Sequence, residues 1–177
     1  GTITSDFLTQ ESLRYRIRAE DYSGQASISD EYTIREGFGI LPDEYFEGFE
    51  GNNAIGWTFE DSWEWGKAVE GIDPEPFEGK GLAATVLGGN YRYNSDDWMV
   101  SPPIDLRDDS LTNVSLRFNH WYDFVHAYDD GTIHVSNDYG ENWTQVGSRI
   151  SIRSNGWREA LVDLSDYIGS TEPVFVG

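Results

Sequence analysis

Hydrophobic and polar residues alternate along most of the chain in short segments that are separated by turn residues. The clearest segment is residues 113–122, where Val114, Leu116 and Phe118 share one face of an extended chain and polar residues share the other. No segment keeps a helical period, so the pattern predicts an all-β antiparallel β-sandwich. Nine strands are expected near residues 45–50, 63–69, 82–87, 97–101, 113–122, 132–136, 144–149, 157–163 and 174–176.

Residues 13–34 predict a separate β-hairpin, because two alternating segments flank an acidic, glycine-containing turn at residues 20–24. Residues 37–43 contain two glycines and a proline and are predicted to be a linker. An isolated hairpin is marginal in water. We therefore expect it either to pack on a sheet, its own or that of a neighbouring copy by strand addition, or to belong to an upstream domain.

Composition narrows the function classes. The 177 residues suffice for one full domain and a fragment. With 12 Lys and Arg against 32 Asp and Glu, the net charge is −20, which disfavours nucleic acid and anionic membranes as partners. The chain has no Cys and no apolar run of the roughly 20 residues that would span a bilayer. These features fit an exported protein.

The order of motifs in residues 44–177 resembles a known type of module. It includes D-W-M-V-S-P-P-I-D-L at 97–106 and G-W at 156–157, which leads to V-D-L-S-D-Y-I-G at 162–169. This series is similar to the MAM-like jelly-roll modules of immune inhibitor A and bacillopeptidase F-type proteases and to cleaved adhesin domains. Residues 1–36, with R-Y-R-I-R-A-E-D-Y-S-G at 14–24, resemble the C-terminal hairpin of a fibronectin type III or other immunoglobulin-like domain.

The resemblance implies a jelly-roll-like sandwich that serves a parent protease or adhesin as an extracellular, non-catalytic accessory domain. Cell-surface proteins or glycans are the further partners that it suggests. Modules of this type continue beyond the V-F-V at 174–176, so the last strand is expected to be cut short or completed by another chain.

The resemblance also implies a structural calcium ion, which prefers six to eight oxygen ligands. The glutamate and aspartate ligands of related modules fall at Glu50 and Asp129, and Asp130 and Asp163 are further candidates. No local spacing matches an EF-hand loop. Each carboxylate could equally be a solvated surface group or a turn former.

Carbohydrate binding is the second hypothesis, because aromatic rings stack on sugar faces. By strand parity Trp63 and Trp65 share a face, as do Tyr91 and Tyr93, so these four residues are the candidate platform. The other expectation for the aromatic residues is structural. Four tryptophans fall where a sandwich needs large core side chains, at Trp57, Trp98, Trp143 and Trp157.

No catalytic signature accompanies these patterns. The sequence lacks GxSxG, HExxH, P-loop and GxGxxG motifs. His120, His126 and His134 are spaced by six and eight residues, which is not a metal-ligand spacing, and only His126 falls in an expected loop. We therefore expect no intrinsic enzyme activity.

Overall fold

The computed structural model describes residues 12–16, 18–20, 22–29, 32–35, 39–42, 45–50, 54, 56–125 and 128–177. Within these ranges the chain is all-β: every strand pair is antiparallel, no α-helix occurs, and one 3₁₀-helix, η2, spans Ser165–Tyr167. The chain divides into two compact units, Gly1–Gly37 and Phe38–Gly177, which are described separately. The expectation of an all-β antiparallel fold is confirmed.

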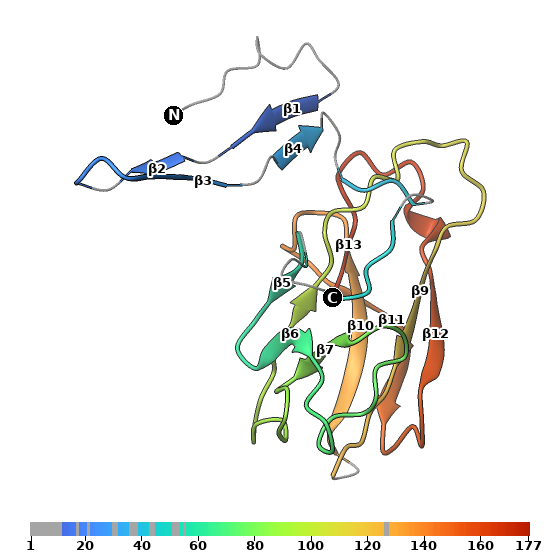
Figure 1. The fold of residues 1–177 in the computed structure, drawn as a ribbon. Helices are drawn as coiled ribbons and strands as arrows, with labels where there is room; N and C mark the ends of the chain where they lie inside the picture. The colour runs from blue at the N-terminus through green and yellow to red at the C-terminus, as the bar shows by residue number, and fades with distance from the viewer. Residues whose placement is uncertain are drawn as a thin grey trace. The chain divides into compact units, whose positions relative to one another are not determined.

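The first unit contains the hairpin that the sequence predicts (Figure 1). Strands β2 (Arg18–Glu20) and β3 (Ala26–Ile28) pair next to the turn, and β1 (Ser12–Tyr15) and β4 (Tyr32–Arg35) pair farther out. Gly24 in the turn has a φ of 84°, a conformation that glycine adopts without steric cost. The immunoglobulin-like origin of this hairpin and its self-association remain predictions.

The second unit is built from short antiparallel sheets. One has the order β11-β10-β13, and three strand pairs are β12-β9, β6-β7 and β5-β8. The strands are β5 (Thr58–Phe59), β6 (Trp63–Lys67), β7 (Gly81–Thr85), β8 (Met99–Val100), β9 (Ser115–His120), β10 (Asp130–Ser136), β11 (Thr144–Ser151), β12 (Arg158–Asp163) and β13 (Phe175–Val176).

The segment that follows β8 links the β5-β8 pair to β13. Ser101 N–H donates to the carbonyl of Val176 at 2.8 Å, and Ile104 forms bridges with both Val174 and Ile40. Ile40 lies in the predicted linker, of which residues 39–42 are described and 37, 38 and 43 lie outside the described residues. This part of the predicted linker is thus hydrogen-bonded within the second unit.

The core of the second unit is aliphatic, with its buried side chains at Ile104, Leu106, Val114, Val135, Val162, Leu164, Val174 and Val176. It receives side chains from β10 and β13 of one sheet and from β12 of another, and Leu116 and Phe118 of β9 pack against it. The inward face predicted for residues 113–122 therefore matches the structure. Burial of this cluster contributes hydrophobic stabilisation to the unit.

The prediction that four tryptophans fill the core is wrong. Trp57, Trp98, Trp143 and Trp157 are all half-buried. Branched aliphatic side chains form the buried cluster, and the four indoles lie outside it. Trp98 and Trp143 contact each other with ring centroids 5.0 Å apart, and the N–H groups of Trp57 and Trp157 donate to oxygen atoms. Trp57 Nε1–H, for example, donates to the Tyr45 hydroxyl at 2.6 Å.

The strand predicted at residues 45–50 is also absent, since this described segment pairs with no other strand. Phe49 has a φ of 54°, which an L-residue in a β-strand does not adopt. The segment is held instead by side-chain bonds, including one from the Phe49 N–H to Glu47 Oε1 at 2.5 Å.

Candidate functional site

Glu50, the first calcium candidate, fastens a loop to the start of β7. Its Oε1 atom accepts hydrogen bonds from the backbone N–H groups of Lys80 at 2.5 Å and Gly81 at 2.6 Å. These two bonds hold the pKa of the exposed carboxyl below its ordinary value. A Cβ on Gly81 would overlap the carbonyl oxygen of Phe49, so the close approach requires glycine.

Asp129 and Asp130 have separate protein partners although they are adjacent in sequence. The Tyr91 hydroxyl donates to Asp129 Oδ2 at 2.7 Å and accepts from the Val125 N–H at 3.0 Å. Burial, together with the neighbouring carboxylate, raises the pKa of Tyr91. Asp130 forms an ion pair with Arg149.

Asp163, the last calcium candidate, is the last residue of β12, and its side chain is bonded to the first residue of η2. Its Oδ1 atom accepts a hydrogen bond from the Ser165 N–H at 2.9 Å. The hydroxyl and the backbone N–H of Ser165 lower the pKa of this exposed carboxyl. The side chain thus stabilises the end of β12 as an acidic turn residue does.

The four calcium candidates do not converge. Across the described part of the chain, no three acidic or histidine side chains come together in an arrangement that could hold a metal ion. A calcium ion at any one of these carboxylates would therefore need most of its six to eight ligands from backbone carbonyls and water. Calcium binding remains a prediction.

The candidate sugar platform at Trp63 and Trp65 belongs to a packed aromatic region. The Trp63 Nε1–H donates to the carbonyl of Asp97 at 3.1 Å, and the Trp65 ring lies 6.4 Å from the ring of Phe59. Both indoles are half-buried. They lie beside a further contact between Phe49 and Phe59, whose ring centroids are 6.4 Å apart.

The second candidate pair, Tyr91 and Tyr93, has two different environments. Tyr91 is half-buried, with its hydroxyl engaged by Val125 and Asp129. Tyr93 is 91% exposed. Tyr93 alone of this pair presents its ring fully to solvent.

The two described histidines, His120 and His134, have different partners. The His120 ring lies 5.3 Å from the Phe118 ring and 5.1 Å from the Tyr122 ring, and desolvation lowers the pKa of His120. His134 Nε2 is 2.9 Å from the hydroxyl of Thr132. His126 lies outside the described residues.

An acidic turn residue that the sequence analysis did not single out as a site, Asp138, organises the hairpin between β10 and β11. Its Oδ1 accepts from the Ser136 hydroxyl at 2.7 Å and the Asn142 N–H at 2.9 Å, and its Oδ2 accepts from Asn142 Nδ2 at 2.7 Å. These bonds, led by the one from the Asn142 N–H, lower the pKa of Asp138. The available signal was the pattern Ser-x-Asp-x-Gly at 136–140, which combines three turn-forming residues.

The loop of residues 68–80, between β6 and β7, is held in place by polar bonds. The carboxylate of Asp73 accepts from the Val69 N–H at 2.7 Å and the Gly88 N–H at 2.8 Å. Trp157 Nε1–H donates to the carbonyl of Glu75 at 2.8 Å, which ties the loop to the start of β12. The loop is therefore preorganised despite its length.

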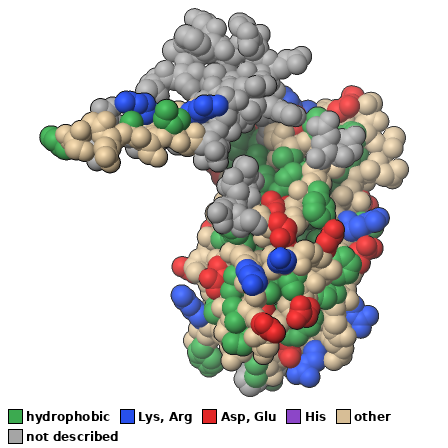
Figure 2. All heavy atoms as spheres, viewed as in Figure 1, with side chains coloured by type: hydrophobic (Ala, Val, Ile, Leu, Met, Phe, Trp, Pro, Cys, Tyr) green, Lys and Arg blue, Asp and Glu red, His purple; other side chains and the backbone are tan. Residues whose placement is uncertain are grey.

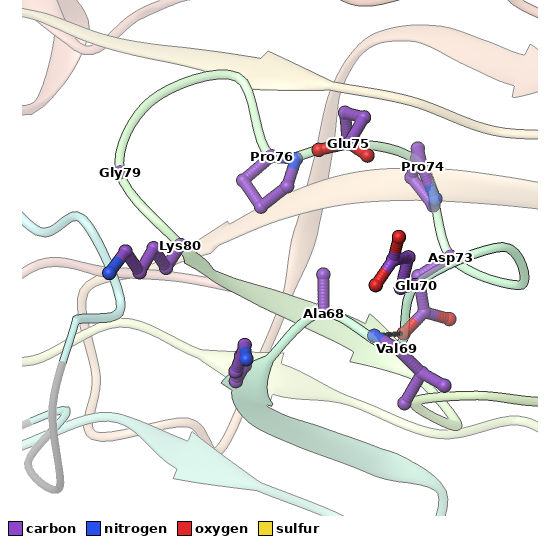
Figure 3. A pocket seen from close by; sticks show the side chains of 10 residues that line it. Ala68, Val69, Glu70, Asp73, Pro74, Glu75, Pro76, Gly79 and Lys80 are labelled. Atoms are coloured by element: carbon purple, nitrogen blue, oxygen red, sulfur yellow. Dashed lines mark hydrogen bonds between the residues drawn. The ribbon is translucent and has the colours of Figure 1, made fainter.

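A hollow of about 480 Å³ lies against this loop. Its described lining has charges of both signs and no aromatic ring. Figure 3 shows the Glu70 carboxylate between Pro74 and Ala68, while Lys80 extends away on the opposite side. The volume falls within the range of small-ligand sites, but the lining offers no stacking surface.

The surface of the second unit mixes chemical types. Figure 2 shows acidic and basic side chains set among hydrophobic ones on the face that it displays. In the part of the chain that the structure describes, no helix has the length and apolar content needed to cross a bilayer.

Comparison of the chain with models of protein families, with curated proteins and with solved structures finds no match.

Proposed function

We propose that this chain is a non-catalytic, extracellular accessory module of a larger secreted protein, a protease or an adhesin. Its second unit would be a jelly-roll-like sandwich and its first unit the end of an immunoglobulin-like domain. The motif order of residues 44–177 and the antiparallel all-β architecture support this proposal. Such a module would position its parent protein on a substrate or a surface.

One observation carries the non-catalytic part of the proposal: prominent carboxylates bond to backbone N–H groups. Glu50, Asp73, Asp138 and Asp163 each accept at least one such bond, and each thereby fixes a loop or a turn. Glycosidase chemistry would instead need two carboxyl groups that face one scissile bond. These four carboxylates thus serve the architecture of the chain.

Calcium binding is a second part of the proposal and is tested separately. Asp129 is the best-placed candidate, because it is half-buried, is oriented by Tyr91 and precedes β10. A calcium ion that binds only the folded state would raise its stability according to its affinity and concentration.

The direct test of the accessory role combines gene context with activity. A subtilisin-like or HExxH-containing domain upstream in the gene would support the proposal. The purified chain should hydrolyse neither casein nor polysaccharides. Hydrolysis of either by the chain, abolished by substitution of one of its own carboxylates, would overturn the non-catalytic assignment.

A further inference from the structure

Strands β9 and β12 form an antiparallel pair (Figure 1). One face of this pair packs on the core, and the other, outer face carries aromatic and polar residues. On its inner side, the rings of Phe118, His120, Tyr122 and Phe124 form successive contacts at 5.3, 5.1 and 6.0 Å. Successive residues along an extended chain point to opposite faces, and alternate residues share a face. Trp121 is thus on the outer side.

The partner strand contributes the other half of this surface. Val162 of β12 is buried, whereas Glu159 and Leu161 are exposed, and Trp157 precedes β12 in the same alternation. We call this surface the Trp121–Trp157 face. It consists of Arg117, Asn119, Glu159 and Leu161 within the strands, and of Trp121 and Trp157, which directly follow β9 and directly precede β12.

The apolar part of the Trp121–Trp157 face combines two exposed side chains with a half-buried indole that is held in place. Trp121 is 40% exposed and Leu161 61% exposed. Trp157 is oriented by its bond to the carbonyl of Glu75, and its ring meets that of Phe77 edge to face at 6.1 Å. Phe77 is itself 59% exposed and extends the aromatic surface. Rigid rings of this kind lose little conformational entropy when a ligand covers them.

The three polar residues of the face include one positive and one negative charge. Asn119 lies opposite Glu159 across the strand pair, and Arg117 Nε is 3.8 Å from Glu159 Oε2. This local balance contrasts with the net charge of −20 of the whole chain. A neutral ligand complements such a surface better than a cationic or anionic ligand does.

We propose that the Trp121–Trp157 face binds a neutral polysaccharide. The indoles present flat apolar surfaces to the C–H faces of sugar rings. The side chains of Asn119, Glu159 and Arg117 supply an amide, a carboxylate and a guanidinium to the hydroxyl groups. This inference rests on the accessory role proposed above and names the surface that would make its contact. The proposed sugar site is therefore a different surface from the platform at Trp63 and Trp65 that the sequence suggested.

The test is retention of the full chain on insoluble cellulose, on chitin and, by affinity electrophoresis, on mixed-linkage β-glucan. Polygalacturonate serves as the anionic comparison. We expect retention on at least one neutral polymer and none on polygalacturonate. Trp121→Ala and Asn119→Ala should each weaken that retention, the former at least tenfold. Phe46→Ala, which removes a ring that is 78% exposed elsewhere, should leave it unchanged.

Thermal melting of each variant establishes that it remains folded, and Trp121→Phe keeps the test informative if Trp121→Ala does not fold. The phenylalanine variant should retain most of the binding. Absence of retention on every neutral polymer would overturn the inference while leaving the accessory role intact. Loss of retention with Tyr93→Ala but not with Trp121→Ala would also overturn it. Release of reducing sugar during incubation would instead refute the non-catalytic function.

Discussion

Leu164 and Leu161 offer a sharp test of where the core of the second unit lies. Both are leucines within four residues of each other, yet Leu164 is 1% exposed and Leu161 is 61% exposed. Replacement by alanine removes the same atoms from both sites. The structure predicts a large loss in the free energy of unfolding for one variant and almost none for the other.

The magnitude follows from burial and from the limited freedom of the surroundings. Substitutions of buried leucine by alanine cost about 2–5 kcal/mol, with larger values where the cavity cannot collapse. Leu164 packs in the aliphatic cluster, and its N–H donates to the carbonyl of Val114 at 2.8 Å, which restrains the backbone. We therefore expect Leu164→Ala to cost about 3–4 kcal/mol. Leu161→Ala should change the stability by less than about 0.5 kcal/mol.

Urea denaturation followed by far-ultraviolet circular dichroism measures both variants. With a slope near 2 kcal/mol per molar urea, Leu164→Ala should lower the midpoint by roughly 1.5–2 M. The midpoint of Leu161→Ala should match that of the wild type. Equal shifts in the two variants, or a cost below about 1 kcal/mol for Leu164→Ala, would refute the assigned core.

Further predictions concern turns, close contacts and metal. Hydrogen bonds hold the pKa of Asp138 below its ordinary value in the folded chain, so the stabilisation that it provides is present above that ordinary value and is lost as the pH falls through the folded pKa. Asp138→Asn should lower the melting temperature at neutral pH, and the melting temperature of this variant should fall less than that of the wild type when the pH is lowered below about 4; an unchanged acid profile would argue against this role. Gly81→Ala places a Cβ on the carbonyl oxygen of Phe49 and should cost about 1–3 kcal/mol in thermal melts. The control Gly131→Ala, whose Cβ would meet its nearest atoms at 3.8 Å, should cost less. Chelation of calcium should lower the melting temperature of the wild type and leave that of Asp129→Asn unchanged; coincident wild-type curves would exclude a stabilising calcium.

The strands with one buried face were predictable, because burial imposes alternation on the sequence. Residues 113–122 illustrate this, since Val114 enters the core and Leu116 and Phe118 pack against it. The turn between β10 and β11 was predictable for a related reason, because turn residues hydrogen-bond their own backbone. Local patterns thus indicated local structure.

The remaining features depend on contacts that local patterns do not encode. The alternation at residues 45–50 suggested a strand, but the backbone at Phe49 and the distant partners of Glu50 produce a fastened loop. The size of Trp157 suggested a core position, whereas its N–H finds the carbonyl of Glu75 at the margin. The Trp121–Trp157 face requires the register between β9 and β12, which is set by tertiary pairing.

The marginal position of the tryptophans has a spectroscopic consequence. All seven are described, and none is fully buried. Six are half-buried and Trp121 is 40% exposed. Their emission in the native protein should therefore lie between that of a buried indole and that of a solvated indole, and unfolding should shift it less than it would for indoles in a dry core. Intrinsic fluorescence would be a sensitive reporter of any molecule that covers the indoles, so that a blue shift upon addition of a ligand would reveal its contact surface directly.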